Sequence, residues 1–284
     1  MNETLKRALS GAVYIALLIF CIQYQYINPK GHSFFILFGI FLLIAVYEFC
    51  SLISINKILP IFFSGIVYFI YFKTNFKQDI PYLSKPAFEL TLTALIITIL
   101  VAIKGIFFLF EKENSPIDKL SKYIYLVGYV ILPFVFITKI PFGIKGYNPK
   151  IIISIFILIW TNDTFAYIVG KSIGKHKLFE RISPKKTIEG FIGGVVFAVI
   201  ASYIISRYYI EVKESATYIW IVIAVIVGVF GTIGDLIESK FKRIAGIKDS
   251  GKIMPGHGGI LDRLDSVIFV APIVFLFYQI LNLL

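Results

Sequence analysis

Long apolar stretches separated by short polar segments dominate the chain from one end to the other. A charge-free window of about 20 residues is long enough to cross the hydrocarbon core of a bilayer as a helix. The pattern therefore predicts an all-α polytopic membrane protein with about nine transmembrane helices. The third and fifth expected helices are short, so eight to ten is the compatible range. The expected helices are residues 8–23, 33–53, 59–72, 88–110, 123–137, 151–170, 190–206, 218–235 and 267–284.

Composition supports a membrane protein and argues against nucleic acid as a partner. Of the 284 residues, 58% are hydrophobic and only 16% are charged, whereas about a quarter of the residues in a soluble domain are charged. In a soluble protein, the formal net charge of +11 would suggest nucleic-acid binding. Here the basic residues flank apolar segments, so membrane topology and anionic lipid headgroups account for them. We expect no nucleic-acid partner.

The distribution of Lys and Arg predicts an orientation. With a cytoplasmic N-terminus, about two thirds of the 28 Lys and Arg residues fall on the cytoplasmic side. This predicts a multi-pass protein of a bacterial-type inner membrane, with its C-terminus on the outer side. Residues 171–189 and 236–266 are the loops richest in charge, and both fall on the cytoplasmic side. Because one helical hairpin separates them, the two loops can meet.

Two carboxylates fall within or at the end of expected spans. Asp163 lies in the second half of the sixth helix, and Asp235 ends the eighth. A carboxylate at bilayer depth costs about 3 kcal/mol or more unless it is paired or faces a polar cavity. Each is therefore a functional candidate, with a structural ion pair as the alternative. The glycines that precede Asp235 recur every third residue, which fits either close helix packing or close approach of a substrate; they are Gly228, Gly231 and Gly234.

The residues after Asp235 form two faces if the eighth helix continues. Asp235, Ser239 and Lys242 then share one face. Apolar side chains at positions 237, 241 and 244 share another face, directed toward lipid or core. This arrangement resembles an interfacial amphipathic helix.

A glycine-rich loop follows, and it leads into a pair of carboxylates. Its Pro and Gly residues at positions 255–259 exclude a regular helix and allow backbone N–H groups to turn toward an anion. Asp262 and Asp265 are three residues apart, so on a helix they face the same way. With Asp235 they would form the oxygen-rich site that Mg²⁺ prefers. A helix that begins near Ile260 would add its N-terminal dipole to phosphate binding.

The other charged loop supplies a matching set of groups. The sequence Ser183-Pro184-Lys185-Lys186-Thr187, followed by Glu189 and Gly190, predicts a turn leading into the seventh helix. Lysines and a hydroxyl at a helix start suit phosphate oxygens. Together the two loops indicate a phosphate or phosphoanhydride substrate, handled with Mg²⁺ at the lipid–water interface.

The polar segments resemble the signature of the CDP-diacylglycerol synthase, or phosphatidate cytidylyltransferase, family. The resemblance is close over residues 160–266, whereas the N-terminal half is similar only in its pattern of spans. We accordingly divide the chain into N-terminal transmembrane helices, residues 1–120, and a C-terminal catalytic region, residues 121–284, with the signature at 239–265. The matching motifs are Asn162-Asp163-x-x-Ala166-Tyr167, Gly170-Lys171-x-x-Gly174-Lys175-His176-Lys177, Ser183-Pro184-Lys185-Lys186-Thr187, Ser239-x-x-Lys242-Arg243, Lys248-Asp249 and His257-Gly258-Gly259-x-x-Asp262-Arg263-x-Asp265.

The resemblance implies an activity and a set of site residues. The implied reaction joins CTP and phosphatidate to give CDP-diacylglycerol and pyrophosphate, in membrane lipid, as a step of phospholipid biosynthesis. The implied cofactor is Mg²⁺, as one ion or as one of two cations, and a homodimer is left open. Metal ligands would be Asp235, Asp262 and Asp265, with Asp249 a weaker candidate; the first three, Lys242 and Arg263 would be catalytic. Substrate-binding residues would be Asn162, Asp163, Lys171, Lys177, Ser183, Lys185, Lys186, Thr187, Ser239, Arg243, Lys248, Asp249, His257, Gly258 and Gly259.

Two other functions fit parts of the pattern. A CTP-dependent lipid kinase would transfer the γ-phosphoryl group to a polyprenol-like alcohol and release CDP. An ion-coupled transporter would explain Asp163 and Asp235 at bilayer depth. The dense polar residues, however, lie on one face rather than at the midplane between repeated halves, which disfavours a transporter.

Overall fold

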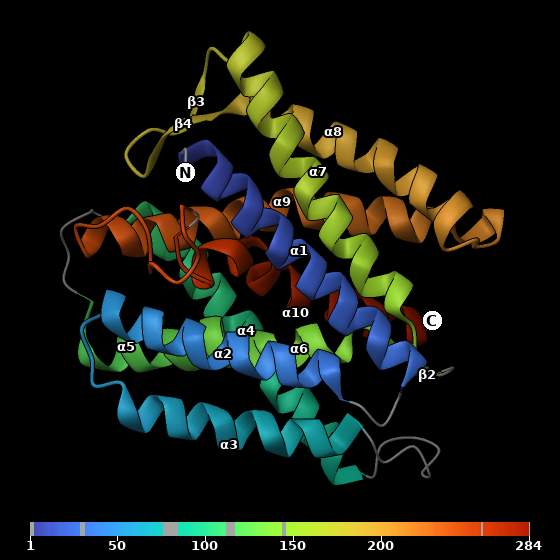
Figure 1. The fold of residues 1–284 in the computed structure, drawn as a ribbon, viewed down its shortest axis with the longest axis horizontal. Coiled ribbons are helices and arrows are strands. Elements are labelled where there is room, and N and C mark those ends of the chain that lie inside the picture. The colour runs from blue at the N-terminus through green and yellow to red at the C-terminus, as the bar shows by residue number, and fades with distance from the viewer. Residues whose placement is uncertain are drawn as a thin grey trace.

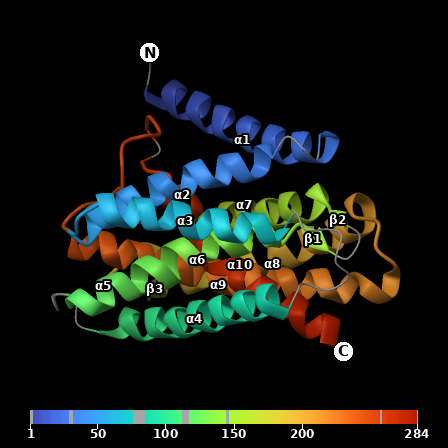
Figure 2. The same cartoon turned by 90° about the horizontal axis from the view of Figure 1, so that it is seen from below.

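Helices that run side by side form almost the whole molecule (Figures 1 and 2). The structure is a computed structural model, and it describes residues 3–28, 32–75, 85–111, 117–143, 146–256 and 258–283. Within these residues, eight helical segments are long and apolar enough to cross a membrane, and the apolar part of a ninth, Ile58–Lys73, is shorter. The all-α polytopic fold is thus confirmed.

Each of the nine expected helices is present, and most extend beyond the expected bounds, whereas α2 ends at Leu52, one residue earlier than expected. The fifth consists of three consecutive pieces, because a π-helical segment interrupts it before Pro133, which cannot donate a backbone hydrogen bond. The helices are α1 (Glu3–Ile27), α2 (Ser33–Leu52), α3 (Ile58–Asn75), α4 (Lys85–Phe110), α5 (Lys119–Tyr125), η2 (Leu126–Ile131), α6 (Leu132–Lys139), α7 (Pro149–Ile173), α8 (Ile188–Ile204) with η3 (Ile205–Tyr209), η4 (Glu214–Ala216), α9 (Thr217–Ile244) and α10 (Leu261–Leu283).

The two charged loops meet at one end of the bundle, as expected. We call this the polar end, made up of the start of α1, residues 171–187, residues 240–256 and residues 258–260; the end of α10 lies at the other end (Figure 1). Arg243 Nε donates a hydrogen bond to the Ile182 carbonyl oxygen at 3.3 Å, which joins the two loops. Ser10 Oγ donates to the Pro255 carbonyl oxygen at 2.9 Å, which brings the start of α1 to the same place.

The segment 183–187 is a strand, so the predicted turn is wrong. β4 (Ser183–Thr187) pairs antiparallel with β3 (Lys177–Phe179), with Lys177 opposite Thr187. A second small hairpin, β1 (Phe142–Gly143) and β2 (Gly146–Tyr147), lies at the opposite end. The start of the following helix is as predicted: Thr187 Oγ1 accepts the Gly190 N–H at 3.1 Å and caps α8. The segment is a strand because it pairs with residues 177–179 in a short hairpin, and the turn of that hairpin lies ahead of Ser183 rather than at it.

α9 continues past Asp235 to Ile244, but it is not an interfacial helix. Its residues 236–242 are all buried in the bundle. The Phe241 ring lies 5.1 Å from the Phe49 ring and 5.0 Å from the Phe108 ring, between centroids. The apolar face of α9 is therefore directed to the protein core, and the interfacial interpretation is wrong.

The glycines before Asp235 are packing positions. A Cβ on Gly228 would lie 2.7 Å from Val195 Cγ2 of α8. A Cβ on Gly234 would lie 2.6 Å from Phe269 Cβ and 2.7 Å from the backbone oxygen of Asp265, both on α10. At Gly228 and Gly234 the structure supports close helix packing, whereas Gly231 has room for a methyl group. The contact at Gly234 also fixes the distance between α9 and α10 beside Asp235.

Gly234→Ala is expected to destabilise the protein by about 1–3 kcal/mol, because the backbone of α10 cannot move away cheaply. Gly231→Ala is the matched control: its Cβ would meet Ser266 Cβ at 3.5 Å, an ordinary contact. Thermal unfolding of the purified protein in detergent measures both. Equal melting temperatures for the two variants would contradict the packing role of Gly234.

Candidate functional site

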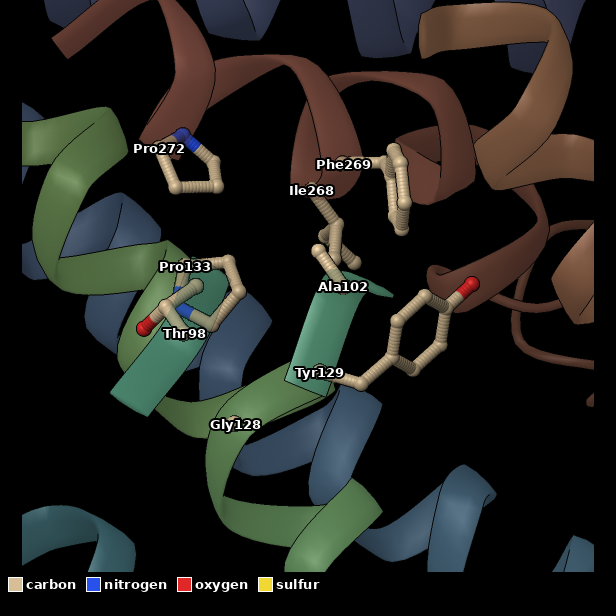
Figure 3. A pocket seen from close by; sticks show the side chains of 8 residues that line it. All are labelled: Thr98, Ala102, Gly128, Tyr129, Pro133, Ile268, Phe269 and Pro272. Atoms are coloured by element: carbon tan, nitrogen blue, oxygen red, sulfur yellow. The ribbon is translucent and has the colours of Figure 1, made fainter. Parts of the chain in front are cut away.

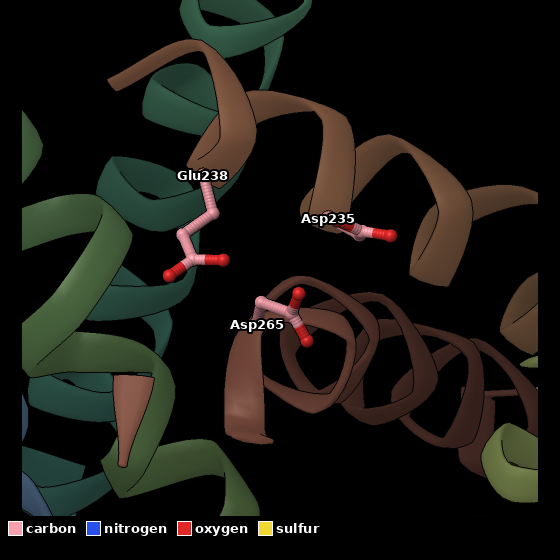
Figure 4. A group of neighbouring side chains, drawn as sticks. All are labelled: Asp235, Glu238 and Asp265. Carbon is pink, nitrogen blue, oxygen red and sulfur yellow. The ribbon is translucent and has the colours of Figure 1, made fainter. Parts of the chain in front are cut away.

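Three carboxylates meet between α9 and α10. Asp235 and Glu238 lie one turn apart on α9, and Asp265 lies on α10 (Figure 4). One oxygen from each lies within 4.8 Å of the others. We call these three residues the carboxylate cluster. Groups of like charge at this separation repel strongly in a medium of low dielectric constant, so the cluster needs compensating cations.

Two lysines supply part of that compensation. Lys186 of β4 forms an ion pair with Asp235 Oδ2. Lys242 Nζ lies 2.7 Å from Glu238 Oε2 and 2.7 Å from Asp262 Oδ1. Lys186 thus joins β4 to α9, and Lys242 joins α9 to α10. The carboxylates nevertheless outnumber the ammonium groups.

The cluster fits a divalent cation. Glu238 Oε1 is buried and has no hydrogen-bond partner among the described residues. Leaving a buried acceptor unsatisfied is costly, and more so when it carries charge. A hard cation such as Mg²⁺ takes carboxylate oxygens at this kind of site. Asp235, Glu238 and Asp265 are the residues that would hold it.

Asp262 lies next to the cluster but is turned away from it. Its Oδ1 accepts from Lys242 Nζ, and its Oδ2 accepts the N–H groups of Ser250 at 2.8 Å and Gly259 at 2.7 Å. Both N–H donors lie in the loop before α10, so Asp262 ties that loop to the first turn of the helix. Lys242 thus connects Asp262 to Glu238. Asp262 as a metal ligand stays a prediction.

The start of α10 does not present an open phosphate site, contrary to expectation. The carboxylate of Glu48, from α2, accepts the N–H of Leu261 at 2.9 Å and that of Ile260 at 3.2 Å. At Gly258, φ is +85°, and a Cβ there would collide with Asp262 Oδ2. The glycine-rich loop therefore wraps the protein's own carboxylates. The predicted His257 lies outside the described residues.

Asn162 and Asp163 approach the cluster from α7. Asn162 Nδ2 donates to Asp163 Oδ1 at 3.3 Å, and Asn162 Oδ1 is a buried oxygen without a partner among the described residues. A Cβ on Gly228 of α9 would lie 3.1 Å from Asn162 Oδ1, so the Asn162 side chain faces α9. Asp163 is exposed, although it lies well inside a span. Both residues thus belong to the same polar region as the cluster.

Some of the other predicted site residues contact other groups of the protein, and the rest have exposed side chains. Ser239 Oγ donates to Asp235 Oδ1 at 3.2 Å, whereas Lys177 Nζ donates to the Pro184 carbonyl oxygen at 2.7 Å, within the hairpin. Lys171 lies over the Tyr167 ring on α7, 5.8 Å from its centroid. Ser183 is half-buried at the start of β4. The side chains of Lys185, Lys248, Asp249 and Arg263 are exposed.

Neither Glu238 nor Glu48 is among the site residues predicted from the sequence. Glu238 had a local signal, because Asp235, Glu238 and Lys242 follow the i, i+3, i+7 spacing of one helix face. Glu48 lies more than 200 residues from its partners, which are the start of α10 and Ser250. No local pattern in the sequence announces such a contact.

A small apolar pocket lies apart from the charged groups, between α4, η2, α6 and α10 (Figure 3). Its two hydroxyl groups are already used: Thr98 Oγ1 donates to the Ala94 carbonyl oxygen, and the Tyr129 hydroxyl donates to the Gly234 carbonyl oxygen at 3.3 Å. The pocket therefore offers no group for chemistry. Its lining residues are Thr98, Ala102, Gly128, Tyr129, Pro133, Ile268, Phe269 and Pro272.

Comparison with known proteins gives a match along nearly the whole chain. A family model described as "Cytidylyltransferase family" matches residues 5–281. Proteins named phosphatidate cytidylyltransferase match one half of the chain: that of Staphylococcus haemolyticus is 43% identical over 148 residues, 52% of this chain and 55% of the relative. That of Staphylococcus aureus is 45% identical over 150 residues, again 52% and 55%. The chain thus spans about half the length, 55%, of the curated relatives it matches.

Neutralising the cluster is expected to weaken divalent-metal binding. Glu238→Gln and Asp265→Asn should each raise the dissociation constant for Mn²⁺, a Mg²⁺ substitute, by about 100-fold or more, because each removes a charged ligand. Asp262→Asn should have a smaller effect, since its oxygens already have other partners. The measurement is free Mn²⁺ by electron paramagnetic resonance, with the exposed Glu180→Gln as control. Unchanged binding in Glu238→Gln would remove Glu238 from the site.

Proposed function

This chain belongs to the cytidylyltransferase family, and from that premise we propose that it is an integral-membrane phosphatidate cytidylyltransferase. It converts CTP and phosphatidate to CDP-diacylglycerol and pyrophosphate, as a nucleotidyltransferase of phospholipid biosynthesis. The observation that carries the proposal is the carboxylate cluster, flanked by Lys186 and Lys242, inside a bundle of membrane-spanning helices. A reaction between a polyanionic nucleotide and a lipid requires a charged site at that depth.

The reaction is a displacement at phosphorus. An oxygen of the phosphatidate phosphate attacks the α-phosphorus of CTP, a new P–O bond forms, and the bond to the β-phosphate bridging oxygen breaks. Pyrophosphate leaves with the electron pair of that bond. A phosphate monoester is ionised near neutral pH, so the step needs no strong general base. The residues of the site have to bring two anions together and hold them in line.

Asp235, Glu238 and Asp265 are the residues that would hold Mg²⁺, with Asp262 and Asp249 as further predicted ligands. When bound, the ion offsets negative charge on the nucleophile and the leaving group. Either one ion or two cations is compatible with this number of carboxylates. Lys242 keeps Glu238 and Asp262 in place, because its ammonium group contacts both.

The remaining cations suit the phosphates of the substrates. Lys186 reaches the cluster from the β3–β4 hairpin, while Lys185, Lys248 and Arg263 are exposed around it. Ammonium and guanidinium groups form strong charge-assisted hydrogen bonds with phosphate oxygens. The excess of Lys and Arg at the polar end favours a cytoplasmic orientation, from which CTP is supplied. Phosphatidate and the lipid product both stay in the bilayer.

Position-specific labelling tests the proposed reaction. With phosphatidate, Mg²⁺ and the purified protein in lipid, CTP labelled at the α-phosphate is expected to transfer its label to lipid. CTP labelled at the γ-phosphate should release its label as pyrophosphate. Label from the γ-position in lipid, together with CDP, would instead identify a CTP-dependent lipid kinase. Absence of labelled lipid with both nucleotides would refute the proposed function.

Asp262→Asn and Asp265→Asn are each expected to lower turnover about 100-fold or more, while expression and membrane insertion persist. Asp265→Asn would remove a charged metal ligand, and Asp262→Asn would remove the ion pair with Lys242. Initial rates at saturating CTP measure the effect, with Glu180→Gln as control. A near-normal rate in either variant would exclude that residue from the reaction.

A further inference from the structure

A buried carboxylate from the N-terminal half of the chain reaches the catalytic loop. Glu48 lies near the end of α2 and is only 2% exposed. Its carboxylate accepts the N–H groups of Ile260 and Leu261, at the start of α10, and the Ser250 hydroxyl at 3.3 Å. The partial positive charge of a helix N-terminus stabilises an anion in this position. Glu48 thus replaces an external anion there.

The loop around Glu48 is shaped to its carboxylate. A Cβ on Gly259 would lie 2.5 Å from Glu48 Oε1 and Oε2, and a Cβ on Gly251 would collide with Glu48 Oε1. Any side chain at these two positions would push the carboxylate out. The two glycines therefore create the space for Glu48, and the fit fixes the loop relative to α2.

The same loop residues contact both Glu48 and Asp262. Ser250 donates its hydroxyl to Glu48 and its backbone N–H to Asp262 Oδ2. Gly259 packs against Glu48 and donates its N–H to the same Asp262 oxygen at 2.7 Å. The Lys242 ammonium group donates hydrogen bonds to Asp262 and to Glu238, which belongs to the carboxylate cluster. An unbroken set of contacts thus leads from α2 to the cluster.

From these contacts we infer that Glu48 is a positioning residue of the metal site. By anchoring the first turn of α10, it sets where Asp265 lies relative to Asp235 and Glu238 on α9. It also occupies the backbone donors at this helix start, so substrate phosphates are directed to the lysine and arginine side chains instead. The inference rests on the proposed function only in taking the cluster as a divalent-metal site.

Mn²⁺ binding to the purified full-length protein without nucleotide tests the inference. Glu48→Gln keeps the shape but removes the charge, and Glu48→Asp keeps the charge but draws the carboxylate back by one methylene. Both are expected to weaken Mn²⁺ binding by roughly 10- to 100-fold, as second-shell substitutions do. Hydrogen exchange should become faster at the amides of Ser250, Gly259, Ile260 and Leu261. Glu211→Gln is the control, because Glu211 is exposed and pairs with Lys150 at the opposite end.

A merely structural role gives a different result. It would reduce the yield of folded protein but leave the Mn²⁺ affinity of the folded fraction unchanged, and that outcome in both Glu48 variants would overturn the inference. If Glu48→Gln does not fold, Glu48→Asp decides the question in the same way. Wild-type protein that binds no Mn²⁺ would overturn it too. Weakened binding in the Glu48 variants, with no CDP-diacylglycerol made by the wild type, would sustain the inference and refute only the proposed function.

Discussion

Buried charge inside an apolar bundle is the constraint on which this structure depends. Glu238 is buried and Asp235 and Asp265 are half-buried between two helices long enough to span a membrane, where screening by water is weak. Their repulsion is tolerable only with cations nearby, and Lys186 and Lys242 each form ion pairs with members of the cluster. The hairpin that carries Lys186 and the loop that binds Asp262 are thus held to the bundle by charges as well as by packing.

Helix ends also compensate buried charge. A carboxylate lies at the N-terminus of one helix, and an ammonium group lies at the C-terminus of another. Glu48 of α2 accepts the N–H groups at the start of α10, while the buried Lys240 of α9 donates to the carbonyl oxygens of Phe108 and Glu111 at the end of α4. An anion at a helix N-terminus and a cation at a helix C-terminus are both favourable arrangements. Each contact joins the N-terminal helices to the C-terminal region. The N-terminal helices and the C-terminal region are therefore joined by buried charged contacts, and the division between them stays a prediction from the sequence.

The proposed function would depend on holding such a site at the depth of a lipid substrate. A soluble enzyme would have to extract that lipid from the bilayer, whereas here the cluster lies on helices long and apolar enough to cross one. Glycine at position 234 keeps α9 and α10 close enough for Asp235 and Asp265 to converge. The proposed role of Glu48 extends this reasoning, because the distance between the two helices and the axial position of α10 are separate requirements. The proposed metal site requires both the correct distance between α9 and α10 and the correct position of α10 along its axis.

The sequence alone determined the features that depend on local pattern. Span length and charge placement predicted all nine helices and the meeting of the two charged loops, and motif order indicated the family. Partners distant in sequence were decided only by the tertiary structure. Glu238 of α9 joins Asp265 of α10 in the cluster, and the N-terminus of α10 receives Glu48 from α2. The physical reason is that helix periodicity and hydropathy act over a few residues, whereas charge compensation in an apolar interior selects whichever groups the packed helices bring together.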